Sequence, residues 1–555
     1  MATMGSQITI RQSEQGETMA QDGDVQKILE SIPAVYRGPG GAIAIVKDGE
    51  LAGQHVWGFS SLEKRIPLTP STIFPICSIS KQMVCLILTE LLAHDKDKVF
   101  ENALNKALHE LLPENLISNK DLTVERLVGM QSGLRDYWAL SVLWGAAPGD
   151  RFSIYSDAPK ALQRLGDFHF APGSQMSYCN TNFMTIGLAI EKASGKSLGD
   201  LLDSRLFKPA GMKTAALRPD TEQIPAPLVG YEGSESAGYI PYKNRIEWAG
   251  DAGIQASLED MIAYEKYIDR AQYDENSAYR KNAQQPHYLD GRKAHYGNGL
   301  GHAEAMGMDS VGHGGALAGF KLHRRYFPEK RTSVIVMLNW EQNPWQIGRH
   351  ALKNLFTPGW KEEEEEKKKG VDKVDVDWTG AYLDKEAKIA VVVTQEKPGE
   401  VVVNYDGHED TISLKSATEA VADDMTITFV GDGKLEIDRI EDGRKFSARK
   451  LAKAPESPDI DYTGNYHSTD VDSSLECTGT GGMLYGSFTG YLGSGPAHLM
   501  RHLGEDVWHL SCYRSLDSTA PGTWTVVFRR GEDGKTVEGV TVGCWLARGV
   551  EYVRT

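Results

Sequence analysis

The stretch FPICSISKQMVCLIL, residues 74–88, places Ser78 and Ser80 beside Lys81 at the start of an apolar run. In an α-helix, side chains three residues apart lie on one face, whereas immediate neighbours diverge by about 100°. We therefore expect Ser78 and Lys81 to meet and Ser80 to point elsewhere. A lysine desolvated at the foot of an apolar helix can accept the proton of a serine hydroxyl, so the pair indicates a nucleophile. The pattern S-x-x-K also occurs by chance, and the alternative is an N-cap serine with a surface lysine.

The bulk composition narrows the class of protein. A chain of 555 residues suggests about two to four domains. Its 41% hydrophobic and 25% charged residues are those of a globular protein rather than a disordered or membrane one. The formal net charge of −16 argues against a nucleic-acid partner and favours a neutral or cationic substrate. No run approaches the ~20 apolar residues of a membrane helix, so no membrane partner is expected.

No motif for targeting, a cofactor or a metal stands out in the sequence. The first 25 residues hold no apolar block of signal-peptide length, and the six cysteines form no C-x-x-C pair. These features predict free thiols in a reducing compartment, and a cytoplasmic location is the default. No H-E-x-x-H motif or similar histidine spacing occurs, and the segment Gly195-Lys-Ser lacks the earlier glycine of a phosphate-binding loop. We expect neither a metal nor a cofactor.

A charge block, KEEEEEKKK at 361–369, divides the chain, because consecutive glutamates repel one another and cannot enter a core. Before the block, two apolar runs around Asp48-Gly49 predict a β-hairpin. Helical periodicity follows after Ser78, strands return around 316–340, and a last helix is expected near 343–356. This order predicts an α/β sheet closed by the two ends of the segment, with a helical subdomain inserted between them.

After the charge block, short alternating strands separated by glycine turns fill 375–555, as in barrels or sandwiches. DWTGAY at 377–382 is echoed by DYTGNY at 461–466, which indicates two similar β domains in tandem, although a six-residue echo can also be chance. The predicted domains are 26–358 (α/β), 359–374 (charged linker), 375–457 (first β-barrel) and 458–555 (second β-barrel).

Two further motifs complete a possible site. In GSQMSYCNTNF, Tyr178 and Asn180 lie two residues apart and can face one cleft, where a phenol would serve as a second proton-transfer group. In VGHGGALAGF, His313 precedes two glycines at the expected start of a strand, where absent Cβ atoms would allow a substrate backbone to approach. Taken singly, a loop tyrosine packing its ring and a glycine turn with an incidental histidine are the simpler interpretations.

The chain order S-x-x-K, Y-x-N, H-x-G resembles the penicillin-recognising serine hydrolases, the superfamily of serine β-lactamases and D,D-peptidases. The D-stereospecific aminopeptidase branch is more similar still, through GPGGAIAIVKDGE, PICSISKQ, QSGLRDYWALSVL, NRIEW, GHGGAL and VGCWLARGVEY, and the likeness runs from about residue 26 to the C-terminus. It implies a multidomain α+β fold, in which a β-lactamase-like α/β domain is followed by two antiparallel lipocalin-like β-barrels. It also implies an enzyme that releases N-terminal D-amino acids, D-alanine above all, from small peptides, amides or esters.

By this resemblance Ser78 is acylated, while Lys81 and Tyr178 share the work of general base and acid; which of them takes the serine proton stays open. The resemblance places the oxyanion at the backbone N–H groups of Ser78 and Ala316, next to Gly315. It gives Asn180 the task of orienting Lys81 or the substrate amide. His313 stands where carboxypeptidases and β-lactamases usually carry lysine. A histidine with a pKa of ~6.5 is mostly neutral at pH 7 and suits neutral amides or esters better than carboxylates.

A loop of the last barrel caps the cleft in this branch and helps to recognise the substrate's amino group. The matching segment here, 485–500, carries Gly493 and Ser494 where the relatives have an acidic loop, and Gly301 stands where they have asparagine. Both changes predict altered specificity at the amine end of the site. A homodimer is a further expectation.

Three other functions stay open. The same acyl-enzyme would ligate or cyclise peptides if an amine outcompeted water. It could also act as an esterase. In the third alternative, the chain is a non-catalytic binding module.

The formal G-x-S-x-G at Gly195–Gly199 would suit an α/β-hydrolase only after an apolar strand. Here we expect Gly195 to end one helix and Ser197 to cap the next.

Overall fold

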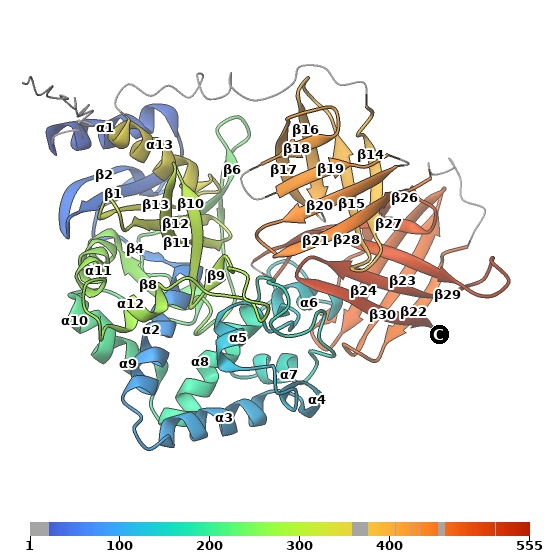
Figure 1. Ribbon diagram of the computed structural model, residues 1–555, viewed down its shortest axis with the longest axis horizontal. Coiled ribbons are helices and arrows are strands. Elements are labelled where there is room, and N and C mark those ends of the chain that lie inside the picture. The colour runs from blue at the N-terminus through green and yellow to red at the C-terminus, as the bar shows by residue number, and fades with distance from the viewer. Residues whose placement is uncertain are drawn as a thin grey trace, which may run out of the picture.

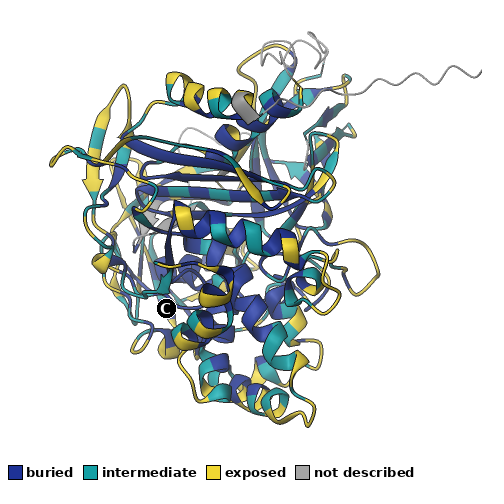
Figure 2. Ribbon diagram, turned by 90° about the vertical axis from the view of Figure 1, so that its left-hand side faces the viewer, coloured by how far each residue is buried: buried dark blue, intermediate teal, exposed yellow. Residues whose placement is uncertain are grey.

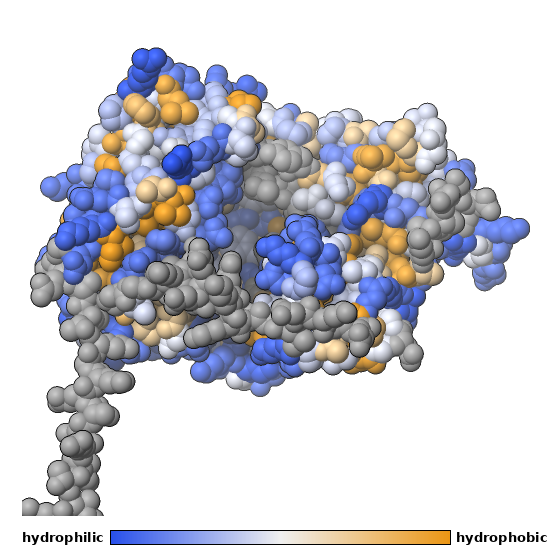
Figure 3. All heavy atoms as spheres, turned by 90° about the horizontal axis from the view of Figure 1, so that it is seen from above, coloured by the Kyte–Doolittle hydropathy of each residue, from blue (hydrophilic) through white to orange (hydrophobic). Residues whose placement is uncertain are grey.

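The computed structural model describes residues 22–357, 376–452 and 461–555, except positions 406, 423–424, 432 and 517. Figure 1 shows an α/β part, coloured blue to yellow-green, beside two β-barrels coloured orange and red. Seen from above, the surface is hollowed between these parts, and hydrophilic side chains border the hollow (Figure 3). The linker predicted at 359–374 lies outside the described residues, and the domain limits given above stay predictions.

The α/β part is built on an eight-stranded sheet whose order is β3-β2-β1-β13-β12-β11-β10-β9. Strand β1 pairs with both β2 and β13, so the two ends of the part meet in one sheet, as predicted. The expected hairpin turns at Asp48 and Gly49, which have φ values of 53° and 76°. In chain order the strands are β1 (Gly40–Lys47), β2 (Glu50–Ser61), β3 (Ile66–Pro67), β9 (Tyr296–Gly297), β10 (Leu300–Ala305), β11 (Met308–Leu317), β12 (Phe320–Phe327) and β13 (Thr332–Leu338).

Helices cover both faces of this sheet (Figures 1 and 2). On one face α1 (Asp22–Val35) and the predicted last helix α13 (Pro344–Phe356) bury an apolar cluster that includes Leu29 and Ile347. On the other face α11 (Leu258–Ala271) lies against β1 and β13, and its capping box at Ser257 fixes where it begins. Figure 2 shows the strands buried between these layers.

The inserted helical subdomain lies below the sheet in Figure 1. Its helices are α2 (Ser80–Ala93), α3 (Val99–Leu111), α4 (Glu114–Ile117), α5 (Val124–Val128), α6 (Tyr137–Leu143), α7 (Ala158–Leu162), α8 (Asn180–Ser194), α9 (Leu198–Leu202), α10 (Lys208–Ala210) and α12 (Ala278–Asn282). Short strands connect it to the sheet: β4 (Ile73–Pro75), β5 (Ala216–Leu217) and β8 (Ile254–Ser257) form one ladder, and β6 (Gly230–Ser234) and β7 (Gly238–Tyr242) form a hairpin.

The segment Gly195–Gly199 is a helix junction and not a nucleophile elbow. Gly195 has φ 65° and ends α8 in the left-handed conformation. The Ser197 hydroxyl accepts a hydrogen bond from the Asp200 backbone N–H and caps α9. Both expectations for this segment are confirmed.

The two predicted barrels are both present. The first closes on itself through β14 (Gly380–Asp384), β15 (Ile389–Thr394), β16 (Glu400–Tyr405), β17 (His408–Leu414), β18 (Glu419–Val421), β19 (Met425–Phe429), β20 (Lys434–Arg439) and β21 (Arg444–Lys450). The second closes where β23 pairs with β24, and β25 lies beside β24. Its strands are β22 (Gly464–Ser468), β23 (Ser473–Thr480), β24 (Met483–Gly490), β25 (Gly493–Ser494), β26 (His498–Gly504), β27 (Val507–Ser515), β28 (Ser518–Arg530), β29 (Val537–Cys544) and β30 (Ala547–Arg554).

The sequence echo marks equivalent points of the two barrels. The Tyr382 hydroxyl donates to the Trp378 carbonyl at 2.9 Å, and the Tyr466 hydroxyl donates to the Tyr462 carbonyl at 2.9 Å. In each barrel the first strand also pairs with the last. The predicted tandem of similar barrels is confirmed.

The second barrel contacts the helical subdomain around α6. Buried Arg135, just before α6, forms an ion pair with Asp470 at 2.9 Å. The Asp136 backbone N–H donates to the Leu546 carbonyl, and the Trp144 indole donates to the Val471 carbonyl. All six cysteines are buried thiols. Within the described residues, none of the helices has the length and apolar character needed to span a bilayer.

Candidate active site

Ser78 lies on a single turn of 3₁₀ helix, Cys77–Ile79, that leads directly into α2. Cys77 has φ 52°, a conformation that costs a non-glycine residue about 1–3 kcal/mol and persists only where packing enforces it. That packing is present, because Cys77 is fully buried and its thiol donates to the Pro75 carbonyl at 3.3 Å. The turn leaves Ser78 half-buried, whereas its neighbours Cys77 and Ile79 are buried.

The two serines of the opening motif have different surroundings. The Lys81 Nζ lies 2.9 Å from the Ser78 Oγ. The Ser80 Oγ instead accepts the Ile254 backbone N–H at 3.1 Å and joins the start of α2 to β8. The expected pairing of Ser78 with Lys81, and the divergence of Ser80, are therefore both present.

Lys81 is fully buried and has three hydrogen-bond partners. Besides Ser78, its Nζ donates to the Asn180 Oδ1 at 2.8 Å and to the Asp251 backbone carbonyl at 2.7 Å. Both of these partners are carbonyl oxygens, which can only accept. The contact with the Ser78 hydroxyl is the one through which Lys81 can either donate or receive a proton.

Three residues that the sequence analysis missed hold Lys81 and Asn180 in place. Asp136 caps α6 by accepting the Trp138 N–H, and it also accepts the N–H of Asn180, the first residue of α8. The Tyr137 hydroxyl donates to the Asp251 carboxylate at 2.7 Å. The signal for Asp136 was visible as an aspartate before an apolar helix.

Burial dominates the electrostatics of these supporting groups. It raises the pKa of Asp136 to about 6, and it raises the pKa of Asp251, although nearby Lys81 lowers both. The two carboxyl groups thus lie in a low-dielectric environment within reach of the Lys81 charge. Tyr137, placed against Asp251, has its pKa raised by the same burial and stays a neutral donor.

A group of three rings flanks Lys81 on the side of the sheet. The centroid of the Tyr178 ring lies 5.1 Å from the Lys81 Nζ and 6.1 Å from the His313 ring. Tyr296, which the sequence analysis also missed, places its hydroxyl 2.8 Å from the His313 Nε2. The His313 Nδ1 lies 2.5 Å from the Gly314 carbonyl, which can only accept.

These contacts fix the protonation of His313. Its Nδ1 carries the hydrogen, so the Nε2 is the acceptor and the Tyr296 hydroxyl is the donor. Burial, with a further contribution from Lys81, lowers the pKa of His313 to about 3. The neutral imidazole expected from the sequence is thus held neutral by its surroundings and not only by its ordinary pKa.

The position of His313 within its strand was predicted wrongly. It lies in the middle of β11 and not at the start, because the strand begins at Met308 and extends through both glycines. A Cβ on Gly315 would lie 2.4 Å from the Ile76 carbonyl oxygen, so the close approach at this glycine is made by the protein's own backbone next to Ser78. The following residue, Ala316, has an exposed side chain.

The remaining predicted residues lie at two other places. Gly301 of β10 pairs with Gly312 of β11 and is half-buried, and an added Cβ would have only the Gly312 carbonyl within 4 Å. Gly493 and Ser494 form β25, which pairs with the end of β24 and packs on the backbone of Gly145 after α6. Lys81 forms hydrogen bonds with none of these three residues.

Within the described ranges no group of three histidine, cysteine, aspartate or glutamate side chains is placed to hold a metal ion.

Comparison with known proteins gives the family. Residues 25–354 match the family model described as β-lactamase, and residues 372–553 match the one described as D-aminopeptidase, domain B. A D-aminopeptidase from Brucella anthropi is 39% identical over 532 residues, which cover 96% of this chain and 98% of the relative. The chain belongs to the D-aminopeptidase family. A D-aminopeptidase from Brucella melitensis biotype 2 is 38% identical over 532 residues, with the same two coverages.

One solved structure supports the fold. The octameric penicillin-binding protein homologue from Pyrococcus abyssi aligns with a TM-score of 0.52 and 22% identity, over 77% of this chain and 99% of that chain. The resemblance inferred from S-x-x-K, Y-x-N and H-x-G is confirmed. So is the expected class of enzyme, a serine hydrolase of the β-lactamase fold, followed by two antiparallel barrels.

Proposed function

We propose that this protein releases N-terminal D-amino acids, such as D-alanine, from small peptides, amides or esters through an acyl-enzyme on Ser78. The names of its D-aminopeptidase relatives support the reaction class. The observation that carries the assignment of the nucleophile is the 2.9 Å contact between the Ser78 Oγ and a fully buried lysine.

The geometry around Lys81 suits a proton shuttle. A neutral lysine has two N–H bonds and one lone pair, and the two carbonyl partners, Asn180 Oδ1 and Asp251 O, take up both N–H bonds. The lone pair then faces the Ser78 hydroxyl. After proton transfer the ammonium donates to the same three oxygens, so neither state requires the site to rearrange.

The proposed reaction has two halves. The Ser78 Oγ gives its proton to Lys81 and bonds to the substrate carbonyl carbon, while the backbone N–H groups of Ser78 and Ala316 stabilise the oxyanion. The C–N or C–O bond then breaks, the departing group takes a proton from Tyr178, and Lys81 passes the serine proton on to Tyr178. Water repeats the sequence on the acyl-enzyme, releases the D-amino acid and returns the proton to Ser78.

Neutral His313 supports a substrate without a carboxylate at this position. A lysine would offer a permanent cation there, whereas the Nε2 of His313 is already occupied as an acceptor from Tyr296. Tyr178, between His313 and Lys81, is the group we assign to protonation of the leaving group. Gly301, Gly493 and Ser494 are proposed to leave more room and less negative charge at the amine end than an asparagine and an acidic loop would.

Relatives named D-aminopeptidases give no support to ligation or cyclisation, to a pure esterase or to a non-catalytic binding module. A homodimer and a cytoplasmic location stay predictions.

The test is release of p-nitroaniline from D- and L-alanine p-nitroanilides by the wild type and by Ser78→Ala. We expect release from the D-series only, and a loss of roughly 10⁴-fold or more in kcat for the variant. Equal release from both series would contradict the chirality. Retained release by the variant would contradict the nucleophile.

A further inference from the structure

A pocket of about 440 Å³ opens between β6, the segment 241–244 and Phe320 of β12. Phe320 pairs with Leu317 across β11 and β12, and therefore shares the sheet face of His313 and Gly315, because side chains alternate along a strand. Its ring also lies edge-on to Phe74, four residues before Ser78. The pocket thus lies on the same face of the sheet as the candidate active site.

One residue that lines the pocket, Asn244, carries a hydrogen-bond acceptor without a partner among the described residues. Asn244 is 3% exposed, and its Nδ2 donates to the Ala318 carbonyl at 3.0 Å, which fixes the orientation of the amide. Its Oδ1 has no hydrogen-bond partner among the described residues. A buried acceptor of this kind normally finds a donor, and a ligand N–H that shifts the lining around Asn244 slightly would supply one.

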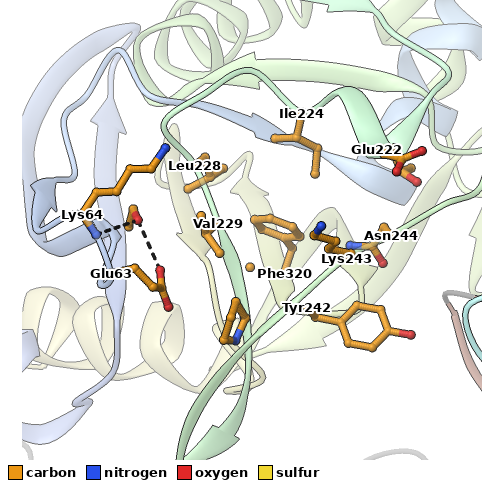
Figure 4. A pocket seen from close by; sticks show the side chains of 14 residues that line it. Glu63, Lys64, Glu222, Ile224, Leu228, Val229, Tyr242, Lys243, Asn244 and Phe320 are labelled. Carbon is orange, nitrogen blue, oxygen red and sulfur yellow. Dashed lines mark hydrogen bonds between the residues drawn. The ribbon is translucent and has the colours of Figure 1, made fainter.

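The rest of the lining is apolar inside and cationic at the rim. Ile224, Leu228, Val229 and Phe320 form the apolar surface. Figure 4 shows Phe320 between Val229 on one side and Lys243 with Asn244 on the other. Such a surface suits an apolar side chain next to an N–H donor.

The charges at the rim are positive on balance. Glu63 accepts the Tyr231 hydroxyl at 2.6 Å, and Glu222 is paired with Arg151. The exposed ammonium groups of Lys64 and Lys243 have no ion pair within the part of the chain that the structure describes. Two unpaired ammonium groups outweigh the Glu63 carboxylate and favour an anionic group, such as the C-terminal carboxylate of a short peptide.

We propose that this pocket binds the leaving part of a peptide substrate, and that the enzyme therefore prefers D-aminoacyl peptides with an apolar residue after the scissile bond to D-amino acid amides. The inference rests on the proposed function, because a free amine ends an aminopeptidase substrate on one side and leaves only the other side to extend. Ala316, at the oxyanion, and Ala318, held by Asn244 in the turn between β11 and β12, are two residues apart in the chain, a separation of at most about 7 Å. A peptide of two to four residues covers that span.

The test compares D-alanyl-L-leucyl-L-alanine with D-alanine amide. Ile224→Trp fills the pocket without touching the hydrogen bond between Asn244 and Ala318. We expect the ratio of kcat/KM for the tripeptide to kcat/KM for the amide to fall roughly tenfold in this variant. Ile117→Trp is the matched control, because Ile117 is also half-buried and lines a separate pocket beside α3. It should leave the ratio unchanged.

Failure of this proposal can be told apart from failure of the proposed function. Turnover of D-alanine amide with a ratio that Ile224→Trp leaves unchanged overturns the pocket assignment and keeps the function. If the wild type turns over neither compound, the affinity of the tripeptide is measured by calorimetry for Ser78→Ala with and without Ile224→Trp. A roughly tenfold weaker affinity when Ile224→Trp is added supports the pocket, and an unchanged affinity overturns it.

Discussion

Replacing Gly315 by alanine is expected to remove activity with only a moderate loss of stability. The added Cβ would lie 2.4 Å from the Ile76 carbonyl oxygen and 3.2 Å from the Cys77 Cβ. Ordinary contact begins near 3.4 Å, so β11 and the turn that carries Ser78 must separate by about 1 Å. Overpacking of this kind costs about 1–3 kcal/mol of folding free energy. A displacement of about 1 Å between catalytic groups costs about 10²-fold in rate.

The neighbouring residue provides the control. A Cβ on Gly314 would meet the His323 Nδ1 at 3.5 Å, which is an ordinary contact, and neither glycine has a positive φ. Activity with D-alanine p-nitroanilide and unfolding in urea are measured for both alanine variants. We expect Gly315→Ala to lose about 10²-fold in kcat/KM while remaining folded, and Gly314→Ala to stay close to the wild type. If both variants keep kcat/KM within about threefold of each other, β11 does not position the site through Gly315.

Two other predictions concern the groups around the site. Tyr137→Phe and Tyr326→Phe each remove a hydroxyl that donates to a buried aspartate, at 2.7 Å and 2.9 Å. Each variant should lower the free energy of unfolding by about 1–3 kcal/mol. Only Tyr137→Phe should also lower kcat, because the backbone carbonyl of its partner Asp251 binds Lys81. Because burial lowers the pKa of His313 to about 3, its neutral form adds stability above pH 6.5 that is lost as the pH falls toward 3. The free energy of unfolding in urea should therefore fall less steeply from pH 7 to pH 4 for His313→Gln than for the wild type. An identical slope for the two proteins would show that His313 titrates normally in the folded protein.

The parts of the fold that follow local rules could be predicted from the sequence. The hairpin at Asp48-Gly49 needs only its turn residues, and the meeting of Ser78 with Lys81 needs only helical spacing. The sequence echo at 377–382 and 461–466 marked the start of each barrel. Its residues recur because both copies form the same local hydrogen bond from a tyrosine hydroxyl to a backbone carbonyl. In each of these cases the interacting groups are within a few residues of one another.

The parts of the site that depend on distant contacts could not be predicted in the same way. The Asp251 carbonyl that binds Lys81 is 170 positions away, and a backbone acceptor leaves no signal in residue type. Tyr296 lies on a two-residue strand, too short for a periodic pattern, yet it sets the tautomer of His313. Gly315 was recognised as a place of close approach, but the partner proved to be Ile76, which only the folded arrangement of β11 against the Ser78 turn reveals.

The central claim is that Ser78 is the nucleophile, and intact-protein mass spectrometry after brief exposure to D-alanine p-nitrophenyl ester tests it most directly. Ser80→Ala is the matched control, because Ser80 is two residues away and its hydroxyl accepts a hydrogen bond from the Ile254 N–H instead of contacting Lys81. The account predicts one D-alanyl adduct on the wild type and on Ser80→Ala, located at Ser78 by peptide mapping, and none on Ser78→Ala. An adduct that persists on Ser78→Ala, or one that disappears from Ser80→Ala while this variant remains folded, would contradict it.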